Sequence, residues 1–381
     1  MNTTNEQQSI DFWLLTVVLI LAGIGLVMVY SSSMYMALEK VGNPSFYFKK
    51  QAVRLFLGLL IMIFMTKLNY RGLINIAHFL LLVGLGLLVV ILINKYITGK
   101  SVGRWLRIAG YAFQPSEFMK VALIVYMSAA ISGLGEKVRD FKKGFLPLFG
   151  ITVLAFLLVV LEPDLGISGL IFVIGMYLLF IGHAKLLHLI IVSVPIAGLI
   201  VLIVNTVSYM QQRWHIYLNP EEGYQISQSI ISIGSGGLFG VGLGNSTQKF
   251  LFLPEQHTDF VFSILAEEIG FIGTSVVLAL MFLYVVRGLR IARQTPDMFG
   301  FLLASGLTVM LGFQVFINIG VATGLLPTTG MTLPFISYGG SSLIISFLAT
   351  GILLNISKHG NHERKMSREF GTRLHKRGPV F

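Results

Sequence analysis

The residues Leu251-Phe-Leu-Pro-Glu-Gln-His-Thr-Asp259 lead directly into the long apolar run Phe260–Val286. The run is long enough to cross the hydrocarbon of a bilayer, which needs roughly 20 residues of helix. The stretch before it carries Glu255, His257 and Asp259, and ionisable groups beside the apolar part of a membrane protein mark functional sites. This part of the chain therefore predicts a membrane helix with a polar site at one end.

Composition extends the same conclusion to the whole chain. Of 381 residues, 55% are hydrophobic and 12% are charged, and the mean hydropathy is +0.80, which excludes an ordinary soluble domain. The absence of period-two alternation disfavours a β-barrel. We expect an all-α polytopic membrane protein of about ten transmembrane helices, with a long extracytoplasmic loop before the eighth. The expected spans, of which the second and sixth are short, are Phe12–Tyr30, Ala52–Met65, Ile74–Ile93, Ser116–Leu134, Phe145–Leu161, Ile167–Ile181, Leu186–Asn205, Phe260–Val286, Phe299–Ile319 and Ile336–Ile356.

The net charge of +11 reflects membrane topology rather than nucleic-acid binding. With ten spans and the N-terminus inside, the inner loops and the tail hold 17 of the 28 Lys and Arg residues. Such a bias sets an orientation with both termini cytosolic. The basic tail Lys358–Phe381 is expected to be a disordered cytosolic segment that touches anionic lipid. The first run follows Met1–Asp11, which has no Lys or Arg, and it is long enough to span, so we expect a membrane helix rather than a signal peptide. Without cysteine, disulfides are excluded.

Three outer connections are long, Ser31–Gln51, Asn94–Pro115 and Thr206–Asp259, and a loop as long as the third is usually functional. Within it, Gln225–Leu238 is expected to form a helix on or in the membrane surface. The glycines that follow lack the spacing of a phosphate-binding loop, which favours a flexible turn where the chain re-enters the membrane surface. The chain shows no internal repeat, so an inverted-repeat transporter has no support.

Gln114-Pro-Ser-Glu-Phe-Met-Lys120 predicts a helix start, with Ser116 as a possible N-cap. Glu117 and Lys120 then share one helix face at i,i+3. They either neutralise each other as an ion pair or face a water-filled cavity, and the two interpretations are compatible. Because a lysine within the membrane is costly, we favour the cavity.

Four further positions remain open from the residues alone. Asp164, in Glu162-Pro-Asp-Leu-Gly166, fits a tight turn and a functional carboxylate equally well. Arg213 suits a phosphate clamp or a lipid headgroup. Trp105 is typical of an interface anchor, and His257 beside Asp259 suits a site or a loop hydrogen bond. No zinc motif or Ser-His-Asp signature is present. Carboxylates with Lys and Arg suit base catalysis against an anionic leaving group, or the movement of a charged headgroup.

Taken together, the motifs resemble those of the SEDS family (shape, elongation, division, sporulation). They fall in order from Phe12 to Ile356 and are jointly specific. The segments that carry the resemblance are Gly103-Arg-Trp-Leu-Arg107, Gln114-Pro-Ser-Glu-Phe-Met-Lys120, Glu162-Pro-Asp-Leu-Gly166, Leu253-Pro-Glu-Gln-His-Thr-Asp-Phe260, Glu267-Glu-Ile-Gly270 and Thr332-Leu-Pro-Phe-Ile-Ser-Tyr-Gly-Gly-Ser-Ser342. Gly242–Lys249 and Asn318–Gly330 look more like the division and sporulation branch (FtsW, SpoVE) than the elongation branch (RodA). Ile167, where the family often has Thr, is one departure, and the single Arg before Trp105 is another.

The resemblance implies residues 1–357 as a ten-span SEDS-type domain, with 358–381 as the tail. It implies a peptidoglycan glycosyltransferase that polymerises lipid II at the outer face of the bacterial cytoplasmic membrane. It further implies a monofunctional class B penicillin-binding transpeptidase as partner, with other divisome membrane proteins. The family's essential carboxylate matches Asp259, its loop tryptophan matches Trp105, and its cavity residues match Glu117, Lys120 and Asp164.

On this basis Asp259 is expected to act as the base in an inverting transfer, with Lys120 and Arg residues of the outer loops offsetting the diphosphate charge. A divalent cation (Mg²⁺ or Mn²⁺) on the diphosphate is possible, but no ligand spacing indicates one. The alternatives are a lipid II flippase and a scaffold that recruits the transpeptidase. Acidic groups and long loops gather on one face, which favours the enzyme.

Overall fold

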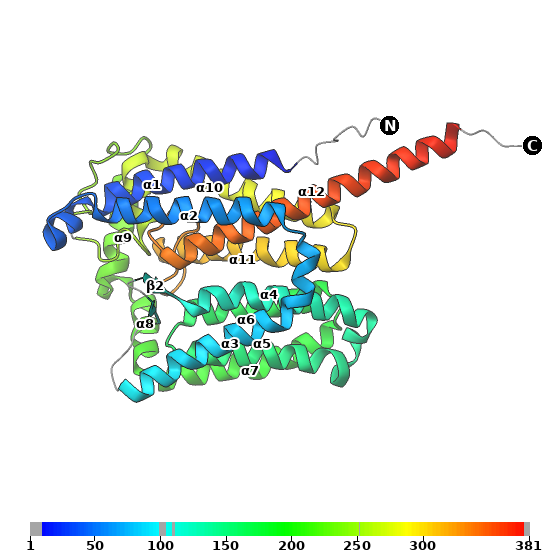
Figure 1. Cartoon of the computed structure of the whole chain (residues 1–381). Helices are drawn as coiled ribbons and strands as arrows, with labels where there is room; N and C mark the ends of the chain where they lie inside the picture. Colours follow the sequence, from blue (N-terminus) through cyan, green and yellow to red (C-terminus); the bar gives the residue numbers. More distant parts are fainter. Residues whose placement is uncertain (1–9, 99–103, 109–110, 251, 377–381) are drawn as a thin grey trace, which may run out of the picture.

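The computed structural model describes residues 10–98, 104–108, 111–250 and 252–376 of the chain. Within these residues, ten long helices form the body of the molecule (Figure 1). They are α1 (Phe12–Val41), α2 (Phe46–Lys67), α3 (Leu73–Thr98), α4 (Pro115–Leu134), α5 (Leu146–Leu161), α6 (Leu165–Ile181), α7 (Leu186–Thr206), α10 (Val261–Gln294), α11 (Met298–Ala322) and α12 (Gly340–Lys376).

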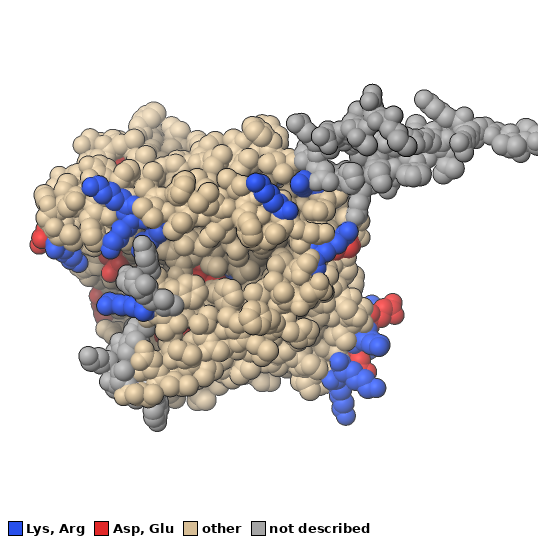
Figure 2. All heavy atoms as spheres, in the orientation of Figure 1, with Lys and Arg blue, Asp and Glu red and all other residues tan. Residues whose placement is uncertain are grey.

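Eight of these helices are long and apolar enough to cross a membrane. The other two are α2, which carries Lys49, Lys50 and Arg54 in its first half, and the shorter α6. Both pack alongside the eight, α2 against α1 and α12, and α6 against α5 and α4. The expectation of an all-α polytopic membrane protein is therefore confirmed. Figure 2 shows the same result on the surface, where a broad belt with few charged side chains separates the Lys and Arg side chains towards the two ends.

The helices are arranged in two groups (Figure 1). One group contains α1, α2, α10, α11 and α12, and the other contains α3 to α7. Helix α11 packs against both α4 and α6 and so joins the groups. The start of α1 and the last residues of α12 lie at one end of the bundle, called the termini end below, whereas the short helices α8 (Ser208–Leu218) and α9 (Tyr224–Ser235) lie at the opposite end. That opposite end is called the loop end below.

At the loop end, two of the three long connections expected from the sequence differ from the prediction. Helix α1 continues to Val41, where Gly42 in the left-handed conformation ends it, so the connection to α2 is short rather than a loop over Ser31–Gln51. The expected span ended at Tyr30, where hydrophobicity falls, but the helix continues through the polar residues that follow. The second connection forms a small antiparallel hairpin of β1 (Leu106–Ile108) and β2 (Tyr111–Phe113), which was not predicted.

The third connection contains the helix predicted over Gln225–Leu238, which is confirmed as α9. At the termini end, α12 extends beyond the predicted span end at Ile356 and stays helical to Lys376. The basic tail therefore begins as a continuation of the last membrane helix. The division of the chain at residue 357 stays a prediction.

Candidate functional site

The segment that carries Asp259 is held by its backbone. Three consecutive carbonyls, those of residues 257, 258 and 259, accept hydrogen bonds from the C-terminal part of the chain. The donors are the Tyr338 N–H at 2.9 Å, the Ser337 hydroxyl at 2.5 Å and the Asn318 amide at 2.8 Å, respectively. Asn318 also donates to the Met331 carbonyl at 2.6 Å. Helix α11 and the loop before α12 therefore fix the position of Asp259.

The Asp259 carboxyl is half-buried and lies among charged groups. A Cβ placed on Gly330 would stand 3.5 Å from both Asp259 Oδ2 and Arg104 Nη1, so these two side chains flank the same glycine. Burial raises the pKa of Asp259 to about 7, and the negative charge of Glu255 adds to this effect, while Arg104 opposes it. A carboxyl with this pKa can accept and return a proton near neutral pH.

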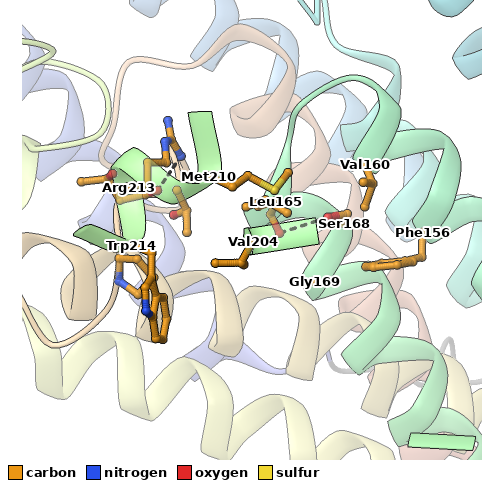
Figure 3. A pocket seen from close by; sticks show the side chains of 12 residues that line it. Phe156, Val160, Leu165, Ser168, Gly169, Val204, Met210, Arg213 and Trp214 are labelled. Atoms are coloured by element: carbon orange, nitrogen blue, oxygen red, sulfur yellow. Dashed lines mark hydrogen bonds between the residues drawn. The ribbon is translucent and has the colours of Figure 1, made fainter. Parts of the chain in front are cut away.

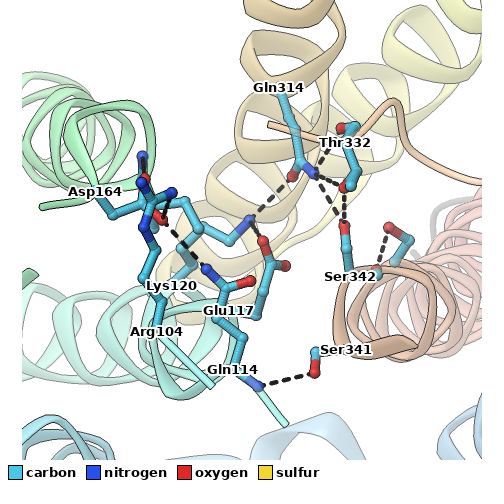
Figure 4. Close-up of polar contacts among 11 residues, drawn as sticks. Arg104, Gln114, Glu117, Lys120, Asp164, Gln314, Thr332, Ser341 and Ser342 are labelled. Atoms are coloured by element: carbon cyan, nitrogen blue, oxygen red, sulfur yellow. Dashed lines mark hydrogen bonds and ion pairs between the residues drawn. The ribbon is translucent and has the colours of Figure 1, made fainter. Parts of the chain in front are cut away.

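Arg104 also connects the hairpin to α6. It forms an ion pair with Asp164 at 3.1 Å and donates to the Pro163 carbonyl at 2.9 Å. Asp164 caps α6 by accepting from the Ile167 N–H at 3.1 Å, and Gln114 donates to the same carboxylate at 3.2 Å (Figure 4). Asp164 is thus both a turn residue and a member of the charged group around Asp259.

Glu162 is a second carboxyl at this end with an unusual environment. It is 3% exposed, and neither of its oxygens has a hydrogen-bond partner. Burial, aided by the nearby charge of Asp164, raises the pKa of Glu162 to about 8. The group therefore carries a proton at neutral pH and adds no charge to the site.

Glu117 and Lys120 form the predicted i,i+3 pair, with 3.0 Å between Lys120 Nζ and Glu117 Oε1. Lys120 also donates to the Gln314 side chain at 3.0 Å, and Gln314 in turn donates to the Thr332 carbonyl and the Ser342 hydroxyl (Figure 4). The expected water-filled cavity does not reach the lysine, because its side chain is fully buried. Through Gln314 and Ser342, the pair connects α4 to α11 and α12.

Arg213 borders a cavity of about 270 Å³ between α5, α6, α7 and α8 (Figure 3). Its guanidinium donates to the Thr328 carbonyl at 2.5 Å, two residues from Gly330. The lining is mostly apolar, with Phe156, Val160 and Trp214 among its residues. An apolar chamber with a cation at its rim suits an amphiphile with an anionic head.

The other two predicted residues lie nearby but face different surroundings. Trp105 is 41% exposed and directly precedes β1. The ring of His257 packs between Tyr47 and Tyr338, at centroid distances of 4.9 and 5.4 Å. Burial lowers the pKa of His257, and its Nδ1 has no hydrogen-bond partner. The structure therefore places His257 in an aromatic cluster.

Several residues of the site were not singled out from the sequence. Arg104 stood within a quoted motif, and its position beside Trp105 was the available signal. Gln314 and Asn318 are amides inside an apolar run, which is a signal for polar contacts within a membrane. Gly330 ends a quoted segment, but nothing in the sequence signalled its role, which arises from two side chains that meet across it. Among the described residues, no group of three or more His, Asp or Glu side chains could hold a metal ion.

These parts form a half-buried carboxyl, two arginines and an apolar chamber at one end of a membrane bundle. A sequence model of the FtsW, RodA and SpoVE proteins, described as cell cycle protein, matches residues 12–362. The chain belongs to this family. The resemblance to SEDS proteins is confirmed over nearly the whole length.

The relatives also agree with the branch that the motifs favoured. Stage V sporulation protein E of Bacillus subtilis is 39% identical over 94% of this chain and 100% of its own length. The probable peptidoglycan glycosyltransferase FtsW of Geobacter sulfurreducens is 40% identical, covering 92% of this chain and 96% of its own.

Two solved structures share the fold. One comes from work on the coordination of polymerization and crosslinking by a peptidoglycan synthase complex, with a TM-score of 0.76 and 29% identity, covering 92% of this chain and 98% of that one. The other is the rod shape determining protein RodA of Thermus thermophilus, with a TM-score of 0.67 and 29% identity, covering 92% and 97%.

Proposed function

We propose that this chain is a peptidoglycan glycosyltransferase that polymerises lipid II into glycan strands for cell division or sporulation. The observation that carries the proposal is the Asp259 carboxyl, whose pKa of about 7 and neighbouring arginines suit base catalysis against an anionic leaving group. The name of the FtsW relative supports the same activity.

In the proposed step, Asp259 accepts the proton of the GlcNAc 4-hydroxyl of an acceptor lipid II. That oxygen forms a bond to the MurNAc anomeric carbon of the growing glycan with inversion. The bond from this carbon to the diphosphate breaks, and undecaprenyl diphosphate leaves with the electron pair. We assign to Arg104 and Arg213 the stabilisation of the diphosphate charge. Lys120, expected in this role, is fully buried and bonded to Glu117 and Gln314.

The apolar cavity beside Arg213 suits the first part of a polyprenyl chain. A divalent cation on the diphosphate stays a prediction, and it would take most of its ligands from the substrate and water. We place the protein in the bacterial cytoplasmic membrane with both termini cytosolic and the loop end outside. A monofunctional class B penicillin-binding transpeptidase is the proposed partner, with other divisome membrane proteins. The structural likeness to a chain from a peptidoglycan synthase complex supports the transpeptidase.

The main rival is a lipid II flippase. A flippase needs comparable access from both leaflets, whereas Asp259, Arg104, Asp164 and Arg213 all gather at the loop end. A polymerase serves one leaflet only, which agrees with this one-sided arrangement. Polymer formation in detergent micelles, where no leaflets exist, distinguishes the two functions.

The direct test is polymerisation of lipid II by purified protein with a candidate transpeptidase, comparing wild type with Asp259→Asn. Loss of a general base should reduce the rate by about 10²–10⁴-fold. Glu221→Gln is the matched control, because Glu221 is an exposed carboxylate in the same long loop and should leave the rate unchanged. Near-normal glycan from Asp259→Asn would contradict the assignment. Lipid II scrambling in sealed vesicles, without polymer in micelles, would favour the flippase.

A further inference from the structure

The glycine-rich segment 236–244, which the proposed reaction does not use, lies against a break in helix α10. The break is at Gly270, whose φ of 67° is left-handed. Four backbone hydrogen bonds join the two: Val241 N–H to the Glu267 carbonyl at 3.0 Å, and Gly242 N–H to that of Glu268 at 3.0 Å. The other two run from Phe271 N–H to the Gly237 carbonyl at 2.9 Å and from Ile272 N–H to that of Leu238 at 3.1 Å.

The close approach explains why glycines recur here. A Cβ on Gly236 would stand 2.1 Å from the Ala266 carbonyl oxygen, and one on Gly240 would stand 2.2 Å from that of Glu268. The contact pairs backbone groups that the helix break leaves open. Non-helical backbone is tolerated within a membrane where other parts of the protein form hydrogen bonds with its N–H and C=O groups. This segment therefore meets that condition at its contact with α10.

The side chains of the segment are apolar and exposed. Between Gly236 and Gly244 there is no charged residue, and Leu238, Phe239 and Leu243 are 61%, 80% and 62% exposed. The exposed surface continues along α10, where Phe271 and Phe282 are 68% and 70% exposed. Helix α10 is one of the helices that can cross the membrane, so the segment continues its lipid-facing side.

Two contacts between α1 and α10 give the depth of the segment. At the termini end, Arg287 of α10 pairs with Asp11, the cap of α1. At the loop end, the Ser31 hydroxyl of α1 donates to Glu268 of α10 at 2.5 Å. At 1.5 Å per residue, the continuous helix α1 covers about 30 Å between Asp11 and Ser31, which matches the hydrocarbon thickness. Glu268 therefore lies level with the edge of the hydrocarbon at the loop end.

Leu238 lies deeper than this edge. Its carbonyl is bonded to Ile272, which is one helical turn closer to the termini end than Glu268. A turn corresponds to about 5 Å of depth. The segment thus dips below the edge and returns, with Leu238 and Phe239 at its deepest part. Interfacial elements insert by about 5–10 Å.

We infer that segment 236–244 is a membrane anchor, which inserts Leu238 and Phe239 among the acyl chains of the leaflet at the loop end. The anchor is tied to the site by Lys249, whose ammonium pairs with Glu268 at 3.5 Å and whose carbonyl accepts from Gln256 at 2.9 Å. Gln256 lies three residues before Asp259. The anchor thereby sets the height of Asp259 above the lipid surface, where a lipid-linked substrate presents its head.

Spin labels on single cysteines test the insertion directly, because the chain has no native cysteine. Labels at Phe239 and Leu243 are compared in nanodiscs of phosphatidylglycerol and phosphatidylethanolamine. A label at Phe282 is the lipid-facing reference, and one at Glu222 is the water-facing reference, since both native side chains are exposed. Collision with oxygen reports lipid, and collision with a water-soluble nickel chelate reports water. Elution as a single species confirms that each labelled protein is folded.

The collision rates of the label at Phe239 should resemble those of the label at Phe282, with oxygen collisions at least about threefold more frequent than at Glu222. The label at Leu243 should give values between those of Phe282 and Glu222. Nickel collisions at Phe239 equal to those at Glu222 would overturn the anchor. Exclusion of both reagents from the label at Phe239 in the protein alone would also overturn it, because the segment would then be packed against protein rather than lipid. These readouts require no catalytic activity, so they stand apart from the test of the proposed function.

Discussion

Breaking the buried pair of Glu117 and Lys120 should cost far more than removing it. Lys120 is fully excluded from solvent, and its Nζ lies 3.0 Å from a side-chain oxygen of Glu117 and 3.0 Å from one of Gln314. The second carboxylate oxygen of Glu117 has no hydrogen-bond partner. Glu117→Gln leaves an uncompensated ammonium in the interior, and Lys120→Met leaves an uncompensated carboxylate. Either change should destabilise the protein by about 3–5 kcal/mol.

The double variant Glu117→Gln/Lys120→Met leaves no buried charge at this position. It should lose no more stability than the worse single variant, which gives a coupling energy of about 3 kcal/mol, at the upper end for residues in contact. Thermal melting in detergent, followed by the fraction that stays monodisperse, should show single-variant shifts of about 4–6 °C. Arg71→Met is the control, because its ion pair with Asp297 is partly exposed and should contribute less than about 1 kcal/mol.

Additive losses in this cycle would refute the reasoning. Additivity would mean that each charge is compensated by groups other than its partner. The network of Gln314 with Thr332 and Ser342 would then be the structural unit that stabilises this region.

Three further outcomes follow from the loop end. Because Asp259 must be ionised to act as a base, the polymerisation rate should rise roughly tenfold between pH 6 and 8. Glu255→Gln should move this rise to lower pH, because the charge of Glu255 raises the pKa of Asp259, and a rate independent of pH over this range would contradict the assigned base. Gly330→Ala, at φ +76° between Arg104 and Asp259, should reduce the rate more than Gly324→Ala, which has nearly the same φ of +75° but contacts isoleucines, and equal rates for the two would argue against a shared site. The pKa of Glu162 is raised from 4.5 to about 8, so burying this carboxyl destabilises the folded protein increasingly as pH rises through this window. Glu162→Gln should therefore melt at the same temperature as wild type at pH 5 and at a higher temperature than wild type at pH 9, and a melting difference that does not change with pH would contradict this.

The membrane helices could be predicted from the sequence because hydrophobic length is a local property. The ten expected spans correspond to the ten long helices, and the ion pair of Glu117 and Lys120 followed from helical spacing alone. Helix ends outside the bilayer were harder, since α1 and α12 continue through polar residues that still favour a helix. The hairpin after α3 was missed because each of its strands is only three residues long.

The site could be predicted only in part, because its geometry depends on contacts between distant segments. Asp259 stood out through its charge beside an apolar run. Its backbone partners Asn318 and Ser337 lie 59 and 79 residues away from their acceptors, and no local pattern connects them. The cavity interpretation of Lys120 failed for a related reason. Gln314, 194 residues further on, occupies the space beside the ammonium.

The bonds that hold residues 257–259 also bear on how the protein is made. Asp259 leaves the ribosome well before Asn318, Ser337 and Tyr338, which supply the donors for these three carbonyls. A nascent chain that has inserted α10 possesses the base but lacks the partners that position it. Assembly of a competent site therefore waits until α11 and the loop before α12 have been synthesised. Completion of the site therefore depends on the chain from α11 to Tyr338, and truncated chains that stop after α10 should insert in the membrane but remain inactive.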